Sequence, residues 1–374
     1  MRKIIEGSIA IAHAVALCRP RVIPAYPITP STHVPEELSK KLADYEFIPV
    51  EAEFSAISAC IGASVAGART FTATSSQGLA LMHEALHNAS GSRLPIVMFV
   101  ANRALSGPLN IWCDWQDSFA QRDTGWLQLC CKNNQEAVDT LIQAFKIAEK
   151  TRFPVMVCAE GFYLTHEISP VDIPAQEEVD AYLPKFSPKF SLDCENPMTF
   201  GAFFPPAYYQ NLKKIQNDEM ISAIPQIAQA GGEFEKQFGR KQFPITEEYA
   251  LAGAETVFVS MNALAENIEI VVDELRQNGE KAGLLRIKCF RPFPRQQIAQ
   301  ALKNAKKIIV LEKTFSPGEE GQLATETKAA LLDGGLSPKA LCAVCGLGGR
   351  DVKLEDIKSV YEKAKAGETG SLWL

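Results

Sequence analysis

Polar side chains follow four short apolar runs in the first part of the chain, at the points where those runs end. The polar segments are Pro27–Thr32 (PITPST), Glu51–Phe54 (EAEF), Ser75–Gly78 (SSQG) and Asn102–Ser106 (NRALS). If the runs are parallel strands, their carboxyl ends meet at one edge of a sheet, where ligands bind in such folds. A carboxylate, several hydroxyls and a guanidinium would then converge. This set suits a polar heteroaromatic cofactor beside a small substrate that carries a carboxylate.

Two histidines match a zinc-binding pattern. His83 and His87 fit H-E-x-x-H, which places two zinc ligands on one helix face. His166 is the only later histidine, and Arg93 stands where a metzincin would have its third ligand. We therefore predict no metal site, and we expect a helix that carries two partly buried histidines. A zinc hydrolase remains a remote alternative.

The ten cysteines do not form a cluster-binding pattern. Cys342 and Cys345 make one C-x-x-C, but a zinc or iron–sulfur site needs four ligands and no second pair lies nearby. Both are expected in the core, because a free cysteine in an apolar run behaves as a small hydrophobe. The cysteine usage is typical of a reducing compartment, and we expect a cytoplasmic protein.

Glycine-rich phosphate cradles are also missing. Neither G-x-x-x-x-G-K-[ST] nor G-x-G-x-x-G occurs. Gly346–Asp351 (GLGGRD) follows a predicted strand and could direct backbone N–H groups at an anion. A structural turn is the better interpretation of this segment.

The elements that must position these residues alternate between strand and helix. This rhythm predicts a parallel sheet with helices on both faces, in a first domain at residues 1–165. A proline-rich connecting segment with a helix at 211–236 follows at 166–245, and a second parallel α/β domain occupies 246–374. The fold class is therefore α/β. Predicted strands are 22–26, 47–50, 70–74, 96–101, 127–131, 155–159, 256–260, 282–287, 307–312 and 340–345; predicted helices include 35–43, 53–66, 79–88, 134–151, 263–278, 296–303 and 323–332.

Composition excludes several classes of protein. The chain has 374 residues and a net charge of -6, so it lacks the basic surplus of a nucleic-acid binder. No stretch of about 18 apolar residues occurs, so no membrane span is expected. The first 17 residues resemble a signal peptide superficially, but Glu6 and His13 interrupt them. We expect a folded first helix there instead.

Motifs along the whole chain resemble the 2-oxoacid:ferredoxin oxidoreductase family, specifically the alpha subunit of the pyruvate synthase type. The resemblance implies a pyrimidine-binding domain of a thiamine diphosphate enzyme, followed by a transketolase C-terminal-like domain. The matching motifs are Tyr26–Pro30 (YPITP) with Glu36-Glu37, Glu51–Gly62, Ala66–Leu79, Leu94–Ser106, Arg122–Trp126 (RDTGW), Asn134–Phe145, Glu160–Pro174, Phe290–Pro294 (FRPFP) and Gly346–Asp351.

The resemblance also implies cofactors and partners. Thiamine diphosphate would be shared with a beta subunit that binds its diphosphate and Mg²⁺ through a G-D-G motif, which this chain lacks. The [4Fe-4S] clusters would lie on gamma and delta (ferredoxin-like) subunits, with a further electron-acceptor subunit as a possible addition. The implied reaction is oxidative decarboxylation of a 2-oxo acid to acyl-CoA and CO₂, with coenzyme A as co-substrate.

The resemblance assigns roles to residues at the predicted rim. Glu53 resembles the glutamate that hydrogen-bonds the aminopyrimidine ring, with Glu51 as the competing candidate. Thr29 and Arg103 resemble the residues that hold the substrate carboxylate, where the planar guanidinium suits a bidentate contact. The implied cofactor contacts are Glu53, Pro27, Ile28, Ser76 and Gln77.

One segment departs from the family pattern. Pyruvate-type relatives read close to N-D-H-S-D-S where this chain has Cys113–Ser118 (CDWQDS), so Trp115 replaces a histidine. The predicted substrate pocket is Thr29, Arg103, Ser106, Gly107 and Trp115, and this Trp puts pyruvate in doubt. A larger or aromatic 2-oxo acid is an alternative, as in an NAD-linked phenylglyoxylate dehydrogenase. Trp115 at a subunit contact, and a non-catalytic scaffold subunit, remain further alternatives.

Overall fold

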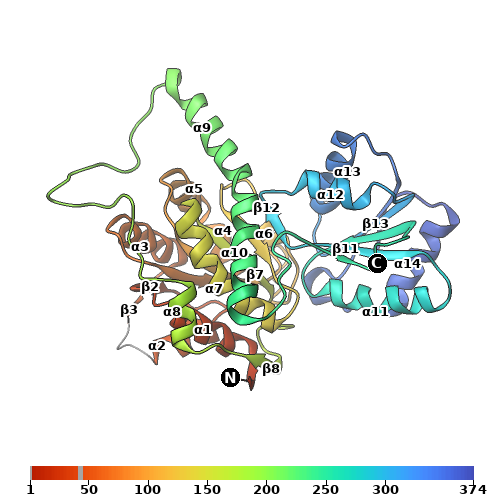
Figure 1. Ribbon diagram of the computed structural model, residues 1–374, viewed down its shortest axis with the longest axis horizontal. Coiled ribbons are helices and arrows are strands. Elements are labelled where there is room, and N and C mark those ends of the chain that lie inside the picture. Colours follow the sequence, from red (N-terminus) through yellow and green to blue (C-terminus); the bar gives the residue numbers. More distant parts are fainter. Residues whose placement is uncertain (1, 41–44) are drawn as a thin grey trace.

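The protein, described here by a computed structural model for residues 2–40 and 45–374, contains two α/β units side by side (Figure 1). In the first unit, four buried parallel strands lie in the order β4-β5-β7-β6. A parallel pair, β2-β3, adjoins β4 through a bridge between Val22 and Thr70. The bounds are β2 Val22–Ala25, β3 Glu46–Pro49, β4 Phe71–Thr74, β5 Val97–Asn102, β6 Leu127–Cys130 and β7 Val155–Glu160.

Helices cover both faces of this sheet, because its strands alternate between two hydrophobic clusters. Phe99 of β5 faces one cluster, with α1, α2, α7 and α10, whereas Met98 and Val100 face the other, with α3, α4 and α5. The helices are α1 Gly7–Leu17, α2 His33–Ser39, α3 Glu53–Val65, α4 Ser76–Leu81, α5 His83–Gly91, α6 Gln116–Phe119 and α7 Asn134–Thr151.

The connecting segment is more structured than the sequence predicts. Its β8 (Ile168–Asp172) pairs antiparallel with β1 (Arg2–Glu6), ahead of α8 (Gln176–Tyr182). The predicted helix 211–236 is two helices, α9 (Pro206–Ile221) and α10 (Ala223–Phe238). Figure 1 shows α9 projecting away from both sheets, and none of its residues is buried. We call residues 198–221 the arm; its exposed apolar side chains are Met198, Phe203, Phe204, Tyr208, Tyr209, Leu212, Ile215 and Ile221.

The second unit is a six-stranded sheet in the order β15-β14-β13-β10-β11-β9, parallel except for β9. One strand of this half, β12 (Cys289–Arg291), instead pairs antiparallel with β6 of the first sheet. The other elements are β9 Thr246–Tyr249, β10 Thr256–Ser260, α11 Leu264–Gln277, β11 Ala282–Ile287, α12 Arg295–Leu302, β13 Lys307–Glu312, α13 Gln322–Asp333, β14 Lys339–Val344, a 3₁₀ turn Leu347–Gly349, α14 Leu354–Ala366 and β15 Gly370–Trp373.

The predicted buried elements are confirmed, and several peripheral predictions are wrong. Helix 134–151 and strands 256–260, 282–287 and 307–312 match residue for residue. The predicted helix 79–88 is two helices, α4 and α5, separated at Met82. The first residues form β1 before the expected helix, and α14 and β15 follow the strand predicted to close the fold. The last part of the predicted helix 35–43 lies outside the described residues.

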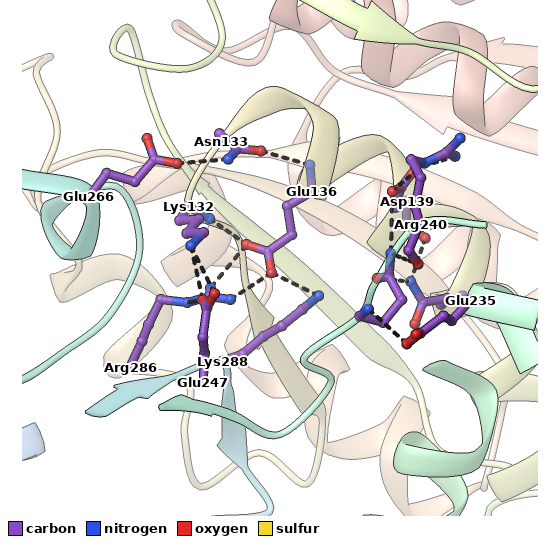
Figure 2. Close-up of polar contacts among 12 residues, drawn as sticks. Lys132, Asn133, Glu136, Asp139, Glu235, Arg240, Glu247, Glu266, Arg286 and Lys288 are labelled. Atoms are coloured by element: carbon purple, nitrogen blue, oxygen red, sulfur yellow. Dashed lines mark hydrogen bonds and ion pairs between the residues drawn. The ribbon is translucent and has the colours of Figure 1, made fainter. Parts of the chain in front are cut away.

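A buried network of charges joins the two units (Figure 2). Arg286 of β11 donates to Glu136 of α7 at 2.8 and 3.0 Å and to Glu247 of β9 at 2.7 Å. Lys288 lies 3.1 Å from Glu136, and Lys132 binds Glu247. Burial alone would raise the pKa of Glu136, but the charges of Arg286 and Lys288 outweigh it and lower the pKa to about 2. The orientation of the two sheets is therefore tied to these contacts.

Removing one member of the network should destabilise the fold strongly. Arg286→Met would leave Glu136 and Glu247 buried with fewer cationic partners, at a cost of about 3–5 kcal/mol in unfolding free energy. Urea unfolding of the full chain measures this loss. The control Arg295→Met breaks an exposed pair with Asp333 and should cost at most about 1 kcal/mol. Equal losses in the two variants would contradict the assignment.

The same network should make stability depend on acid pH. Because the folded pKa of Glu136 lies near 2, below its usual 4.5, its contribution is complete above about pH 4.5. That contribution, roughly 3 kcal/mol, is lost as the pH falls toward 2. Urea midpoints between pH 7 and 3 should fall less steeply for Arg286→Met than for the unchanged chain. Parallel curves would show that Glu136 does not titrate as inferred.

Candidate functional site

The structure brings Glu53 to the rim and turns Glu51 away from it. Glu53 is the first residue of α3 and is buried, with its carboxylate against the backbone of Gly78. A β-carbon at position 78 would lie only 2.4 Å from Oε1 of Glu53. Glu51 is exposed and accepts a hydrogen bond from the Ser55 hydroxyl at 2.5 Å, which lowers its pKa. The geometry therefore favours Glu53 of the two competing carboxylates.

Polar groups around Glu53 lack partners within residues 2–40 and 45–374. Among the described residues, no group donates a hydrogen bond to the Glu53 carboxylate. Nε2 of Gln77 and the hydroxyl of Thr74 are buried without hydrogen-bond partners. A β-carbon at Gly78 would also lie 2.7 Å from the Thr74 hydroxyl, so Thr74 and Glu53 flank the same space. Since a buried polar group without a partner is costly, Nε2 of Gln77 and the Thr74 hydroxyl are candidates for hydrogen bonds to a polar ligand.

Ser76 shapes the loop rather than presenting its hydroxyl. It begins α4 with a φ of +50°, which is unusual for a residue other than glycine. Its hydroxyl is hydrogen-bonded to the carbonyl of Ala104 and, at 2.5 Å, to Oε1 of Gln77. Its backbone N–H donates to Asp117 at 2.9 Å. Ser76 therefore joins the ends of β4 and β5, and Gln77 is the residue with a free donor.

Arg103 and Thr29 are brought together as the sequence predicts. Nη1 of Arg103 donates to the Thr29 carbonyl at 3.0 Å, and Nε donates to the Asn110 carbonyl at 3.0 Å. Nη2 has no hydrogen-bond partner among the residues described. Thr29 itself is exposed, as is Pro27, while Ile28 is half-buried. Backbone carbonyls therefore hold Nε and Nη1 of the guanidinium, and Nη2 is the nitrogen left for an anion.

The remaining predicted pocket residues fall into two groups. Ser106 and Gly107 lie on an exposed loop, where Gly107 has a φ of +104° that favours glycine. The prediction that Trp115 lines the substrate pocket is wrong. Its side chain is completely buried, and its Nε1 donates to Glu160 at 3.0 Å. It therefore lines neither an open pocket nor a subunit contact. Trp112, which the sequence argument missed, is the half-exposed aromatic of this segment.

The histidine and cysteine motifs form no metal site among the described residues. His83 and His87 are exposed rather than partly buried, and His83 is hydrogen-bonded to Gln121 at 2.6 Å. Across residues 2–40 and 45–374, no three His, Cys, Asp or Glu side chains gather closely enough to hold a metal ion. Cys342 and Cys345 are buried, as expected, and all ten cysteines are free thiols. No described helix is both long and apolar enough to cross a membrane.

Gly346–Asp351 is a joint between the two units. The N–H of Gly349 donates to the Cys113 carbonyl at 2.7 Å, and that of Gly348 donates to Asp114 at 3.3 Å. A β-carbon on Gly348 or Gly349 would clash with Asn110 or Trp112 of the first unit. The structural interpretation of this turn is therefore supported, since protein acceptors occupy those N–H groups.

Comparison with known proteins identifies the family. The thiamine diphosphate-binding domain of pyruvate flavodoxin/ferredoxin oxidoreductase matches residues 13–230. The chain belongs to this family. Core domain II of pyruvate:ferredoxin oxidoreductase matches residues 254–357 of this oxidoreductase family member.

Relatives match over nearly the whole chain. Pyruvate synthase subunit PorA of Methanosarcina barkeri is 49% identical over 370 residues, which cover 97% of this chain and 92% of that protein. The PorA of Pyrococcus furiosus is 46% identical, covering 97% and 94%. Ketoisovalerate oxidoreductase subunit VorA of Pyrococcus abyssi is 43% identical, covering 98% and 94%. These names favour the pyruvate synthase type over the phenylglyoxylate alternative and over a zinc hydrolase.

Solved structures share the α/β fold. The 2-oxoglutarate:ferredoxin oxidoreductase from Magnetococcus marinus matches with a TM-score of 0.75 at 20% identity, covering 97% of this chain and 65% of that one. A split gene transketolase matches with a TM-score of 0.57 at 13% identity, covering 96% and 98%. The expected fold class, two parallel-sheet units of the thiamine-enzyme type, is confirmed.

The contact between Glu53 and Gly78 gives a direct test of the site. In Gly78→Ala, the added methyl would displace the Glu53 carboxylate and should lower pyruvate-dependent reduction of a viologen dye by the assembled complex about 100-fold. The control is Gly62→Ala on the same helix as Glu53, where a β-carbon meets nothing within 4 Å. That variant should keep full activity. Full activity in Gly78→Ala would remove Glu53 from the site.

Proposed function

We propose that this chain is the alpha subunit of a CoA-acylating 2-oxoacid:ferredoxin oxidoreductase complex with pyruvate as its 2-oxo acid. The observation that carries the proposal is that the rim presents two groups without partners among the described residues, the buried carboxylate of Glu53 and Nη2 of Arg103. PorA relatives at 45–49% identity support pyruvate over a branched 2-oxo acid. The reason for doubting pyruvate is weakened too, because Trp115 lies in the core.

The residues at the rim fit thiamine diphosphate, the cofactor that the matching family description names. Gln77 and Thr74 carry buried polar atoms without partners among the described residues, and glycine at position 78 lets the Glu53 carboxylate pack against the backbone there. Glu53, Gln77, Ile28 and Pro27 would hold its pyrimidine half. When bound, the cofactor supplies the nucleophilic carbon and the electron sink that decarboxylation of a 2-oxo acid requires.

The chain's own residues then have distinct tasks. The carboxylate of Glu53 would hold and exchange a proton at the aminopyrimidine ring of the bound cofactor, and its burial would keep water from that contact. Nη2 of Arg103 pairs with the substrate carboxylate, helped by the hydroxyl of exposed Thr29. The two backbone carbonyls that hold Nη1 and Nε fix the plane of the guanidinium before substrate arrives.

The proposed partners supply what the described part of the chain does not offer. The diphosphate and Mg²⁺ are assigned to a beta subunit, because the N–H groups of Gly348 and Gly349 already have protein acceptors. The [4Fe-4S] clusters and electron transfer are assigned to gamma and delta subunits, because nine cysteines are buried free thiols and no group of three or more metal-ligating side chains occurs among the described residues. The apolar side chains of the arm support an assembly. Coenzyme A is the proposed acyl acceptor and the cytoplasm the proposed location.

Replacing Glu53 tests the proposal. In the assembled complex, Glu53→Gln removes the proton-exchanging carboxylate and should lower pyruvate-dependent, CoA-dependent dye reduction by about 10²–10⁴-fold. Glu51→Gln is the matched control, since its carboxylate is exposed and accepts from the Ser55 hydroxyl, and it should retain activity. Activity that survives Glu53→Gln would refute the catalytic assignment and favour a scaffold role. A panel of pyruvate, branched and aryl 2-oxo acids tests the substrate.

A further inference from the structure

Asp117 of α6 is a buried carboxylate to which no role has been given so far. Its side chain has no exposed surface, and it lies directly beneath the rim. We propose that Asp117 is a positioning residue. It fixes the proposed cofactor-binding segment Ser76–Gly78 and the proposed substrate-binding Arg103 relative to each other. This inference rests on the function proposed above, which makes Gln77 and Arg103 site residues.

One oxygen of Asp117 connects the two site segments. Oδ2 accepts hydrogen bonds from the backbone N–H of Ser76 and from that of Arg103, both at 2.9 Å. The first donor lies at the end of β4 and the second at the end of β5. Two segments 27 positions apart in the chain, as the numbering of Ser76 and Arg103 shows, therefore share one acceptor. A shift in this oxygen would move both segments together.

The other oxygen holds the carboxylate itself in place. Oδ1 accepts from Nδ2 of Asn102 and from the N–H of Ser118, each at 2.7 Å. Four N–H groups thus surround Asp117. Burial raises its pKa to about 6 despite these hydrogen bonds, so the carboxylate is ionised at neutral pH and accepts at both oxygens.

Both segments of the site need a fixed hydrogen-bond acceptor of this kind. Ser76 is held in the left-handed region of φ, a conformation that is strained for a residue other than glycine and persists only where the surroundings fix it. Gln77 and Gly78, which contact the cofactor space and Glu53, follow immediately. At the second segment, the backbone N–H of Arg103 donates to Asp117. This contact fixes the backbone from which the guanidinium extends to the Thr29 carbonyl.

The variant Asp117→Asn tests this role, because an amide cannot accept at both positions. One pair of N–H donors would face an NH₂ group and separate. In the complex carrying this variant, we expect the KM for pyruvate and the half-saturating concentration of thiamine diphosphate both to rise by about 10- to 100-fold. A purely structural role would instead reduce the amount of active complex, lowering kcat while leaving both concentrations unchanged.

Asp139→Asn is the matched control. Asp139 is an equally buried carboxylate on α7, bonded to Arg240 at 2.7 and 2.9 Å on a different face of the sheet. This variant should lose stability while keeping both half-saturation values. If Asp117→Asn does not assemble, Asn102→Ala removes one donor to Oδ1 and should raise both values in the same direction but less.

The outcomes separate the inference from the function on which it rests. If Glu53→Gln abolishes activity and both half-saturation values are unchanged in an assembled Asp117→Asn complex, or in Asn102→Ala where the first does not assemble, the positioning role is overturned alone. If Glu53→Gln leaves activity intact, the proposed function fails and the inference fails with it. A rise in both values with Asp117→Asn, and in neither with Asp139→Asn, is the expected result.

Discussion

A buried network of opposite charges is the constraint on which the rest of the structure depends. Glu136, Glu247, Lys132 and Arg286 come from both α/β units, and each charge is removed from water at a cost that only its partners offset. Because ion pairs tolerate little change in distance, this network fixes one orientation of the two units. The antiparallel pairing of β12 with β6 continues the first sheet into the second half of the chain and reinforces that orientation.

The second unit contacts the candidate site through the segment between Arg103 and Trp115. Lys313 of the second unit binds Glu160 at 2.7 Å, and Glu160 in turn accepts from Trp115. Asn110 donates to the Gly348 carbonyl at 3.1 Å, while its own carbonyl accepts from Arg103. The second unit thus supports the loop that holds Arg103, although it contributes no predicted site residue.

The sequence predicts the buried elements well and the peripheral ones poorly. Helix α7 and strands β10, β11 and β13 match residue for residue, because burial on both faces demands continuous apolar runs or a regular 3.6-residue period. The strands β1, β8, β9 and β12 escaped prediction, since short edge strands depend on a partner that lies far away in the chain. The helix of the arm was predicted only from residue 211, and no residue of α9 is buried.

By itself, the sequence determined which residue types stand at the strand ends: the carboxylate of Glu53, the guanidinium of Arg103 and the glycine at position 78. Only the tertiary structure buried Glu53 and exposed Glu51, placed Trp115 in the core, and brought Asp117 within hydrogen-bond distance of both Ser76 and Arg103. The physical reason is that burial and hydrogen bonding are pairwise properties. The environment of a side chain depends on residues that pack against it from distant parts of the chain. Its neighbours in the sequence do not reveal which residues these are.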